Sequence, residues 1–226
     1  MQSQPRQAHR ALPSIATEGD AAIIRIVGMI DEHFPGFGDL SGVRTAVVDA
    51  SRVTYMTSFG VAKWLKAMAA VPYTLSTLYL AGCPPIFVDQ LTMILGFAGR
   101  SRIVSLLVPY TCMSCGRETN EIVDVVGRRD LPEQKCTQCG GKLALDAIAD
   151  GYLTSLAKFG ASSVDPAVAR LLTADPSQLR ERVIAAQVAP KPAPVKADKP
   201  RSVPLLAVFI ALAIAIAAVA YLLVPR

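Results

Sequence analysis

The sequence contains very little histidine and none of the short glycine motifs that mark phosphate-binding loops. Only two histidines occur, His9 and His33, and neither lies in a pattern typical of a nucleophile with its general base. His33 follows two acids, Asp31 and Glu32, and a solvated loop is enough to explain that cluster. No GxxxxGK or GxGxxG motif is present, so the phosphate-cradling loops that these motifs mark are absent. These absences favour a non-enzymatic protein.

Residues 1–20 lack the apolar run that a signal peptide requires, so we expect a flexible N-terminus without an export signal. The opposite end of the chain contains a long apolar run, residues 205–224, without a charged side chain. About 20 apolar residues span the hydrocarbon core of a bilayer, so this run predicts a transmembrane helix. Small residues at every fourth position, Ala207, Ala211 and Ala215, leave homo-oligomer formation through this helix open.

The charges beside the apolar run predict its orientation. Four basic residues precede it in a proline- and lysine-rich linker, residues 188–204: Lys191, Lys196, Lys199 and Arg201. Only Pro225 and Arg226 follow it. By the positive-inside rule, the N-terminal domains should then face the cytoplasm. We therefore expect a single-pass, tail-anchored membrane protein whose cysteines lie in a reducing compartment, which disfavours disulfides.

Four of the five cysteines form two CxxC pairs, Cys112 with Cys115 and Cys136 with Cys139. Four thiolates at this spacing suit one tetrahedral metal ion, and the glycine after each pair permits the tight turn that such a site needs. Four cysteine ligands leave no open coordination position, so the sequence predicts a structural Zn²⁺ in a ribbon over residues 109–145. Iron also suits four thiolates, and that choice stays open. The fifth cysteine, Cys83, is predicted to be a small buried thiol.

Zinc ribbons also occur in nucleic-acid-binding proteins, but this ribbon has no excess of positive charge. Between residues 110 and 145, five basic side chains are balanced by five acidic ones. The formal net charge of the whole chain is +5, part of which comes from the linker. Because nucleic-acid binding normally requires a basic surface, it is the less favoured interpretation.

Strand-like and helix-like segments alternate over the first hundred residues, which predicts an α/β fold. Strands are expected over residues 22–27, 46–49, 77–80 and 102–108. Two amphipathic helices are expected between them, the first with Val61, Trp64, Leu65 and Met68 on one face and the second with Phe87, Leu91, Ile94 and Leu95. The glycine-rich stretch between residues 31 and 47 predicts a loop. Its Phe34 and Phe37 should fill the core, with a contact surface as the alternative.

The order of these elements resembles the STAS domain, the fold of anti-sigma factor antagonists and of the cytoplasmic tails of sulfate transporters. The resemblance covers residues 21–108 and is most specific in residues 47–61, VVDASRVTYMTSFGV. In that family a loop at the start of the following helix commonly has the sequence Asp-Ser-Ser-Gly, where this chain has Thr57, Ser58, Phe59 and Gly60. The resemblance implies a mixed sheet, no cofactor in this domain, and docking of a partner protein near that helix start.

The resemblance also implies that Ser58 occupies the position that partner kinases phosphorylate in many family members. A phosphate there would meet free N–H groups and the positive end of the helix dipole. Helix capping by Thr57 or Ser58 is the simpler explanation of the same residues. Ser58, Thr57 and Gly60 are therefore the candidate residues for phosphorylation or partner docking. Thr57 and Phe59 depart from the family's usual Asp and Ser.

Residues 146–187 are predicted to form a helical segment after the ribbon. Two helices are expected over residues 145–159 and 165–172, and a third from Asp175 with Leu179, Val183 and Ile184 on one face. Asp165 should cap the second helix, with Pro166 in its first turn. Their composition does not indicate whether these helices pack on the ribbon or bind another chain.

Together these patterns predict an α/β protein with a STAS-like mixed sheet, followed by a small zinc ribbon, short helices and one transmembrane helix. We expect a non-enzymatic, membrane-tethered protein-interaction or regulatory module in bacterial signalling. Its expected partner is a kinase, a regulator or a transporter subunit. An accessory subunit of a membrane transport complex is the alternative, and a zinc-ribbon nucleic-acid-binding protein is the less favoured one.

Overall fold

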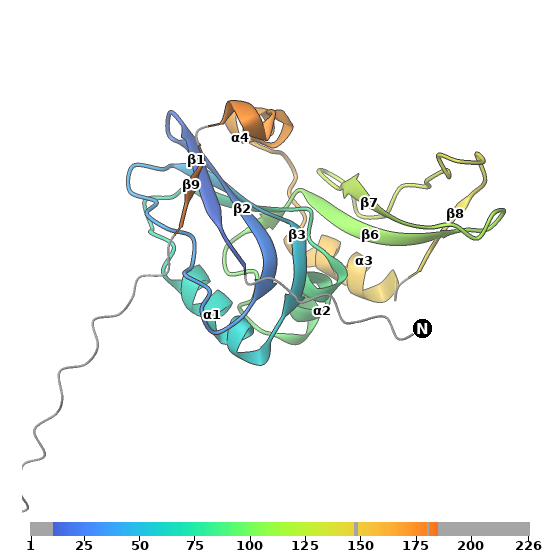
Figure 1. Ribbon diagram of the computed structural model, residues 1–226, viewed down its shortest axis with the longest axis horizontal. Coiled ribbons are helices and arrows are strands. Elements are labelled where there is room, and N and C mark those ends of the chain that lie inside the picture. The colour runs from blue at the N-terminus through green and yellow to red at the C-terminus, as the bar shows by residue number, and fades with distance from the viewer. Residues whose placement is uncertain (1–10, 147–148, 180, 185–226) are drawn as a thin grey trace, which may run out of the picture. The chain divides into compact units, whose positions relative to one another are not determined.

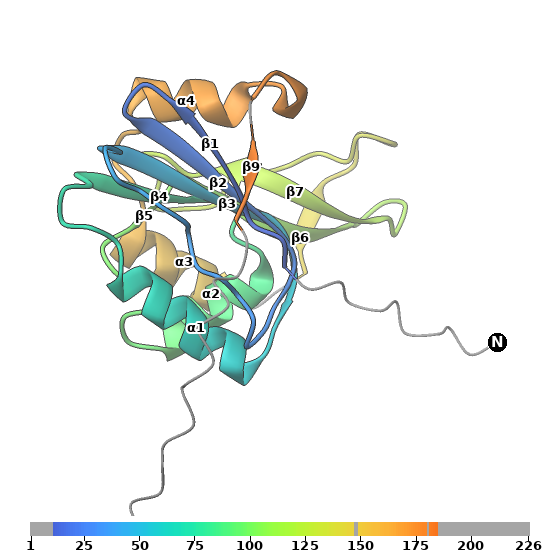
Figure 2. The same cartoon turned by 60° about the vertical axis from the view of Figure 1, so that its left-hand side comes forward.

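A mixed β-sheet forms the centre of the fold, as Figures 1 and 2 show. The computed structural model describes residues 11–146, 149–179 and 181–184. The strands of this sheet are β1 (Ser14–Glu18), β2 (Ala21–Ile30), β3 (Thr45–Met56), β4 (Thr77–Ala81), β5 (Arg102–Ile103) and β9 (Arg182–Val183). They lie in the order β5-β4-β3-β2-β1-β9, in which β2 to β5 are parallel and β1 is antiparallel to both of its neighbours. The predicted α/β fold with a mixed sheet is confirmed.

The central strand β2 is buried on both faces, which explains its nearly continuous apolar sequence. Ala22, Ile24 and Ile26 contribute to the larger core, whereas Ala21 and Ile23 contribute to a second core on the opposite face. Helices therefore cover both faces of the sheet. Because side chains alternate along a strand, a single strand supplies both cores.

Three helices cover one face of the sheet and a fourth lies on the other (Figure 2). They are α1 (Ser58–Ala69), α2 (Pro85–Met93) and α3 (Ala149–Phe159), with α4 (Pro166–Thr173) opposite. Trp64 and Met68 are buried as predicted. Leu95 was expected on the apolar face of the second helix. That expectation was wrong, because α2 ends at Met93 and Leu95 is fully exposed.

The stretch between β2 and β3 forms no helix, and its two phenylalanines enter the core as predicted. Phe34 and Phe37 are both buried, and their ring centroids lie 6.2 and 5.2 Å from that of Trp64. The two rings therefore pack against Trp64 of α1 within the core.

The single strand predicted over residues 102–108 is instead divided between two sheets. β5 ends at Ile103, and β6 (Ser105–Cys112) belongs to a second sheet with β7 (Glu118–Asp124) and β8 (Leu143–Leu145), in the order β7-β6-β8. β6 also forms backbone hydrogen bonds with Cys83, just after β4. The Cys83 amide donates to the Ser105 carbonyl, and the Leu107 amide donates to the Cys83 carbonyl. β4 ends at Ala81, so a longer β5 would lack a pairing partner.

Two expectations for the C-terminal segment were wrong in detail. α3 begins at Ala149 rather than at Leu145, because residues 143–145 pair with β6 as β8. The third helix is absent from the described residues: Asp175 caps one short turn, η1 (Pro176–Gln178), and the chain then pairs with β1 as β9. α4 forms as predicted, with the Asp165 side chain accepting from the Ala167 amide at 2.8 Å.

The expectation of a flexible N-terminus over residues 1–20 was wrong for residues 14–18, which form β1. Ile15 and Ala16 in this strand are buried against the two cores, and that burial offsets the cost of ordering the segment. Residues 1–10, the linker and the predicted span 205–224 lie outside the described residues. Within the described part of the chain, no helix combines the length and apolarity needed to cross a membrane.

Candidate functional site

The second sheet brings the four predicted metal ligands together. Cys112 is the last residue of β6, Cys115 follows three residues later, and Cys136 and Cys139 lie in the turn before β8. The Sγ atoms of Cys112 and Cys139 are 3.5 Å apart, and those of Cys115 and Cys136 are 3.8 Å apart. All four sulfurs lie within 4.8 Å of one another. The cysteines, every one of them in the described part of the chain, are free thiols rather than disulfides.

Each CxxC pair sits in the same kind of backbone turn. The amide of Gly116 donates to the carbonyl of Cys112 at 2.9 Å, and the amide of Gly140 donates to that of Cys136 at 2.8 Å. Both glycines have left-handed backbone, with φ of 70° and 72°. A residue with a Cβ would be strained at these two positions, which accounts for a glycine after each pair.

A third glycine lets the two turns approach each other, a role that the sequence did not reveal. A Cβ on Gly141 would overlap the Ser114 hydroxyl and lie 3.2 Å from the Cys112 sulfur. The Gly141 carbonyl also accepts from the Cys136 amide at 2.8 Å. Gly141 is thus a spacer between the two turns, and the paired Gly140-Gly141 was the only signal for it.

The backbone around the sulfurs favours the thiolate form. Amide N–H groups of Cys115 and Ser114 lower the pKa of Cys112 to about 6. Amides of Gln138 and Cys139 likewise lower the pKa of Cys136. The Gly141 amide lowers the pKa of Cys139, but hydrogen bonds with the thiols of Cys112 and Cys115 outweigh it and raise that pKa to about 12. Four crowded sulfurs cannot all ionise without a cation among them.

A tetrahedral metal ion fits this donor set. Zinc–sulfur bonds of about 2.3 Å place the sulfurs about 3.8 Å apart in a tetrahedron. The two sulfur separations in the structure, 3.5 and 3.8 Å, agree with that spacing. With four sulfur ligands no position stays open for a substrate, so a metal here would stabilise the ribbon.

The three predicted docking residues at the start of α1 have different roles. Thr57 is the helix cap, since its hydroxyl accepts from the Gly60 amide at 2.9 Å. Gly60 is buried, and a Cβ there would overlap the carbonyl oxygen of Ile30 at the end of β2. Both residues therefore have structural roles. Ser58, the first residue of the helix, is exposed.

Two exposed aromatic side chains lie close to Ser58 in the sequence. Phe59 is 71% exposed, and Tyr55, near the end of β3, is 54% exposed. The sequence analysis noted Phe59 only as a departure from a family pattern. The sequence signal for its exposure was its position at the helix start, outside the apolar face that contains Trp64 and Met68.

The acidic cluster near His33 lies in a loop as predicted, but Asp31 is only 6% exposed, so the expectation that the whole cluster is solvated was wrong. The Asp31 carboxylate accepts from the His33 amide at 2.9 Å, and the His33 ring is about half exposed between Asp31 and Glu32. Cys83 is fully buried as predicted, and burial is the main reason that its pKa is raised. The ligand atoms of Asp31, Glu32 and His33 lie within 4.8 Å of one another.

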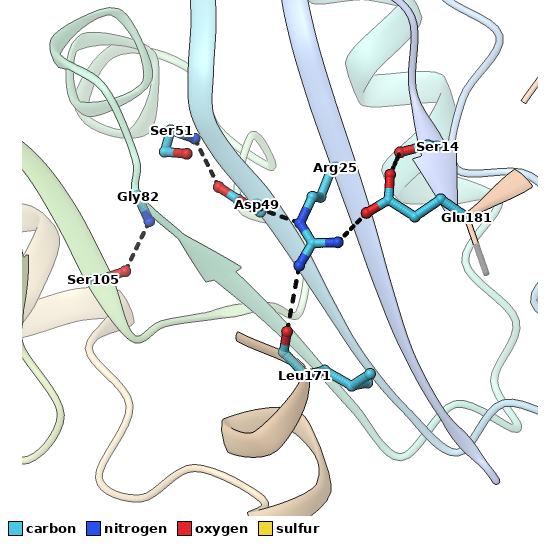
Figure 3. Close-up of polar contacts among 8 residues, drawn as sticks. All are labelled: Ser14, Arg25, Asp49, Ser51, Gly82, Ser105, Leu171 and Glu181. Carbon is cyan, nitrogen blue, oxygen red and sulfur yellow. Dashed lines mark hydrogen bonds and ion pairs between the residues drawn. The ribbon is translucent and has the colours of Figure 1, made fainter. Parts of the chain in front are cut away.

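A polar cluster that the sequence analysis missed lies on the second face of the sheet (Figure 3). Arg25, in the middle of β2, is only 4% exposed. Its guanidinium forms an ion pair with Glu181 and lies 3.8 Å from a carboxylate oxygen of Asp49. A single arginine within the apolar run of residues 22–27 was the signal for it.

Comparison with protein-family models and with curated proteins found no match for this chain.

Proposed function

We propose that this protein is a non-enzymatic docking module, tethered to the cytoplasmic face of a bacterial membrane by residues 205–224. A STAS-like domain carries the docking surface, and a zinc ribbon packs against that domain and stabilises it. The observation that carries the proposal is the exposure of Ser58 and Phe59 on a helix start that Thr57 and Gly60 hold rigidly against the sheet. The docking surface is defined as Tyr55, Ser58 and Phe59.

The docking surface is suited to binding a protein. Exposed aromatic side chains are rigid, and aromatic residues such as tyrosine frequently supply much of the binding energy at protein interfaces. A fixed backbone beneath them limits the entropy lost on association. The expected partner is a kinase or another regulator of the same signalling system.

Ser58 is well placed for control of this surface by phosphorylation. Within the described part of the chain, the Thr57 hydroxyl accepts from the Gly60 amide, and other amides in the first turn could bind a phosphate. A phosphate would add charge beside Phe59 without entering the core, because Ser58 is exposed. Phosphorylation would thereby weaken or redirect docking while the fold stays intact.

The metal centre supports a structural rather than a catalytic role. Four sulfur ligands would close the coordination sphere of such a metal, and two of the cysteines, Cys112 and Cys136, belong to the same hydrophobic core as the main sheet. Zinc bound there would hold β6, β7 and β8 in place. The ribbon would then be a rigid support that contacts α2 and β4 through β6.

The proposal is tested by partner capture from detergent-solubilised native membranes. The full-length chain is compared with Ser58→Asp and with Ser163→Asp, which adds the same charge at an exposed loop between α3 and α4. We expect a partner that wild type and Ser163→Asp retain and Ser58→Asp loses, with equal metal content in all three. Equal recovery by all three would contradict docking at Ser58.

A further inference from the structure

Arg25 is a buried cation whose principal partner comes from the end of the described chain. Its guanidinium pairs with the Glu181 carboxylate, which also accepts from the Ser14 hydroxyl at 2.8 Å. Among the described residues, Arg25 also lies 3.4 Å from the Leu171 carbonyl oxygen and 3.8 Å from a carboxylate oxygen of Asp49, and Figure 3 shows both contacts. Arg25 therefore depends on Glu181 for its closest charge partner.

Glu181 belongs to a short segment, the strap, defined as residues 181–184. Within it Arg182 and Val183 pair with Ile15 and Ser14 as β9, and the Ile184 amide donates to the Pro13 carbonyl at 2.8 Å. The strap thus lies along the outer edge of β1 and places a carboxylate over Arg25. It combines backbone pairing with one charged contact.

The strap has fewer buried contacts than the part of the sheet that it covers. β9 is two residues long, and Val183 is 70% exposed. Ile184 is the strap's half-buried anchor, in contact with the main core. Arg25, by contrast, is fixed in a central strand and almost wholly desolvated. Segments with few buried contacts open at low free-energy cost.

The surface under the strap has the parts of a site for an extended segment. β1 has a free edge beyond Ser14 and Ile15, since within the described chain β9 pairs only with those two residues. Arg25 supplies a cation, and the exposed side chain of Leu12 extends the edge with apolar surface. Strand addition obtains affinity from backbone hydrogen bonds and specificity from such side-chain contacts.

We propose that the strap occupies the binding site for an extended, acidic segment of a partner protein. That segment adds a strand to the edge of β1, places a carboxylate on Arg25 at the position of Glu181, and follows it three residues later with an apolar side chain at the position of Ile184. The strap shields this edge until such a segment displaces it. This site does not include Ser58, and it does not depend on docking at α1.

The first test measures amide hydrogen exchange across residues 181–184 in the full-length, detergent-solubilised chain. In Glu181→Gln the charged contact is lost, and we expect strap exchange to rise roughly tenfold or more while the amides of β2 and β3 are unchanged. Glu133→Gln is the matched control, because it removes an exposed carboxylate that pairs with Lys142 on the ribbon. Strap exchange unchanged in Glu181→Gln would overturn the proposal.

A second variant keeps the test valid if Glu181→Gln alters the fold. Arg25→Met retains much of the side-chain volume without charge, a replacement that buried ion pairs often tolerate. Exchange of the strap should again accelerate, and equal protection in Arg25→Met and wild type would overturn the role of Arg25.

The third test uses a fluorescent peptide with the sequence of residues 175–184 and a second peptide with Gln in place of Glu181. Against the Glu181→Gln chain, we expect the glutamate peptide to bind roughly tenfold more tightly. Against the Arg25→Met chain, the two peptides should bind equally. Equal affinities for the Glu181→Gln chain would overturn the proposal. A stable dimer of Glu181→Gln by light scattering would also overturn it, by assigning the edge to a second copy of this chain.

Discussion

The indole N–H of Trp64 donates a hydrogen bond to the carbonyl oxygen of Phe97 at 2.9 Å. This bond joins α1 to the loop after α2, inside a cluster in which Phe34, Phe37 and Phe87 also contact the indole. Trp64 is the only tryptophan in the chain and is fully buried.

Trp64→Ala should therefore lower the free energy of unfolding by about 3–5 kcal/mol, the usual cost of removing a large aromatic side chain from a core. Urea unfolding followed by circular dichroism measures it. Trp64→Phe keeps much of the ring volume but leaves the Phe97 carbonyl without its indole partner, so its loss should be smaller. A loss in Trp64→Ala no greater than in Trp64→Phe would contradict this packing.

Thr57→Ala should cost about 1 kcal/mol of stability, because it removes the hydroxyl that caps α1. Ser58→Ala is the matched control, and it should change stability by less than about 0.5 kcal/mol since Ser58 is exposed and is not the cap. Thermal or urea unfolding of both variants measures the difference. The reverse order would make Ser58 the cap and would remove it from the docking surface.

Gly60→Ala should destabilise the protein by about 1–3 kcal/mol, although alanine normally stabilises a helix relative to glycine by about 1 kcal/mol. The added methyl group would overlap the Ile30 carbonyl and push α1 away from β2. Ala62→Gly, at an exposed position two residues later, serves as the control and should show only the ordinary helix penalty. A stabilised Gly60→Ala would show that the helix does not lie this close to the strand.

Metal analysis should find one metal ion per chain, and a strong chelator should remove the exchange protection of β6 to β8. The reason is that the metal supplies folding free energy to a ribbon with little core of its own. Cys115→Ser should lose the metal, whereas Cys83→Ala should keep it, because Cys83 lies outside the cluster of four. Full metal content in Cys115→Ser would contradict four-sulfur coordination.

Gly141→Ala should weaken metal binding by roughly 10- to 100-fold, as changes just outside a ligand set commonly do. Its methyl group would collide with Ser114 and crowd the Cys112 sulfur. The double variant Ser114→Gly with Gly141→Ala removes one partner of that collision and should recover part of the affinity. Competition with a chromophoric chelator measures all three affinities, and wild-type affinity in Gly141→Ala would refute the spacer role.

Features with a local cause were predictable from the sequence. The Asp165 cap, the buried face of α1 around Trp64 and the turn within each CxxC pair depend on spacings of a few residues, which a sequence displays directly. The burial of Phe34 and Phe37 was predictable because the glycine-rich loop left a gap in the α/β pattern.

Features that depend on distant pairing were not predictable. Residues 102–108 were predicted as one strand, yet the run divides before Ser105, because β4 ends and offers no further pairing partner. Leu179, Val183 and Ile184 fit a helical pattern, but residues 182–183 form a strand because the edge of β1 is free there. The role of Gly141 depends on Ser114, which lies on the other cysteine turn.

The placement of α4 has a consequence for a chain that is still being synthesised. α4 covers Ile23 and Val47 on the second face of the sheet, and it follows the ribbon in the sequence. The strands β1 to β5 are therefore complete long before their cover exists. At about 5–20 residues per second, the nascent sheet would expose this apolar face for some seconds. Chaperones at the ribosome have that interval in which to bind it.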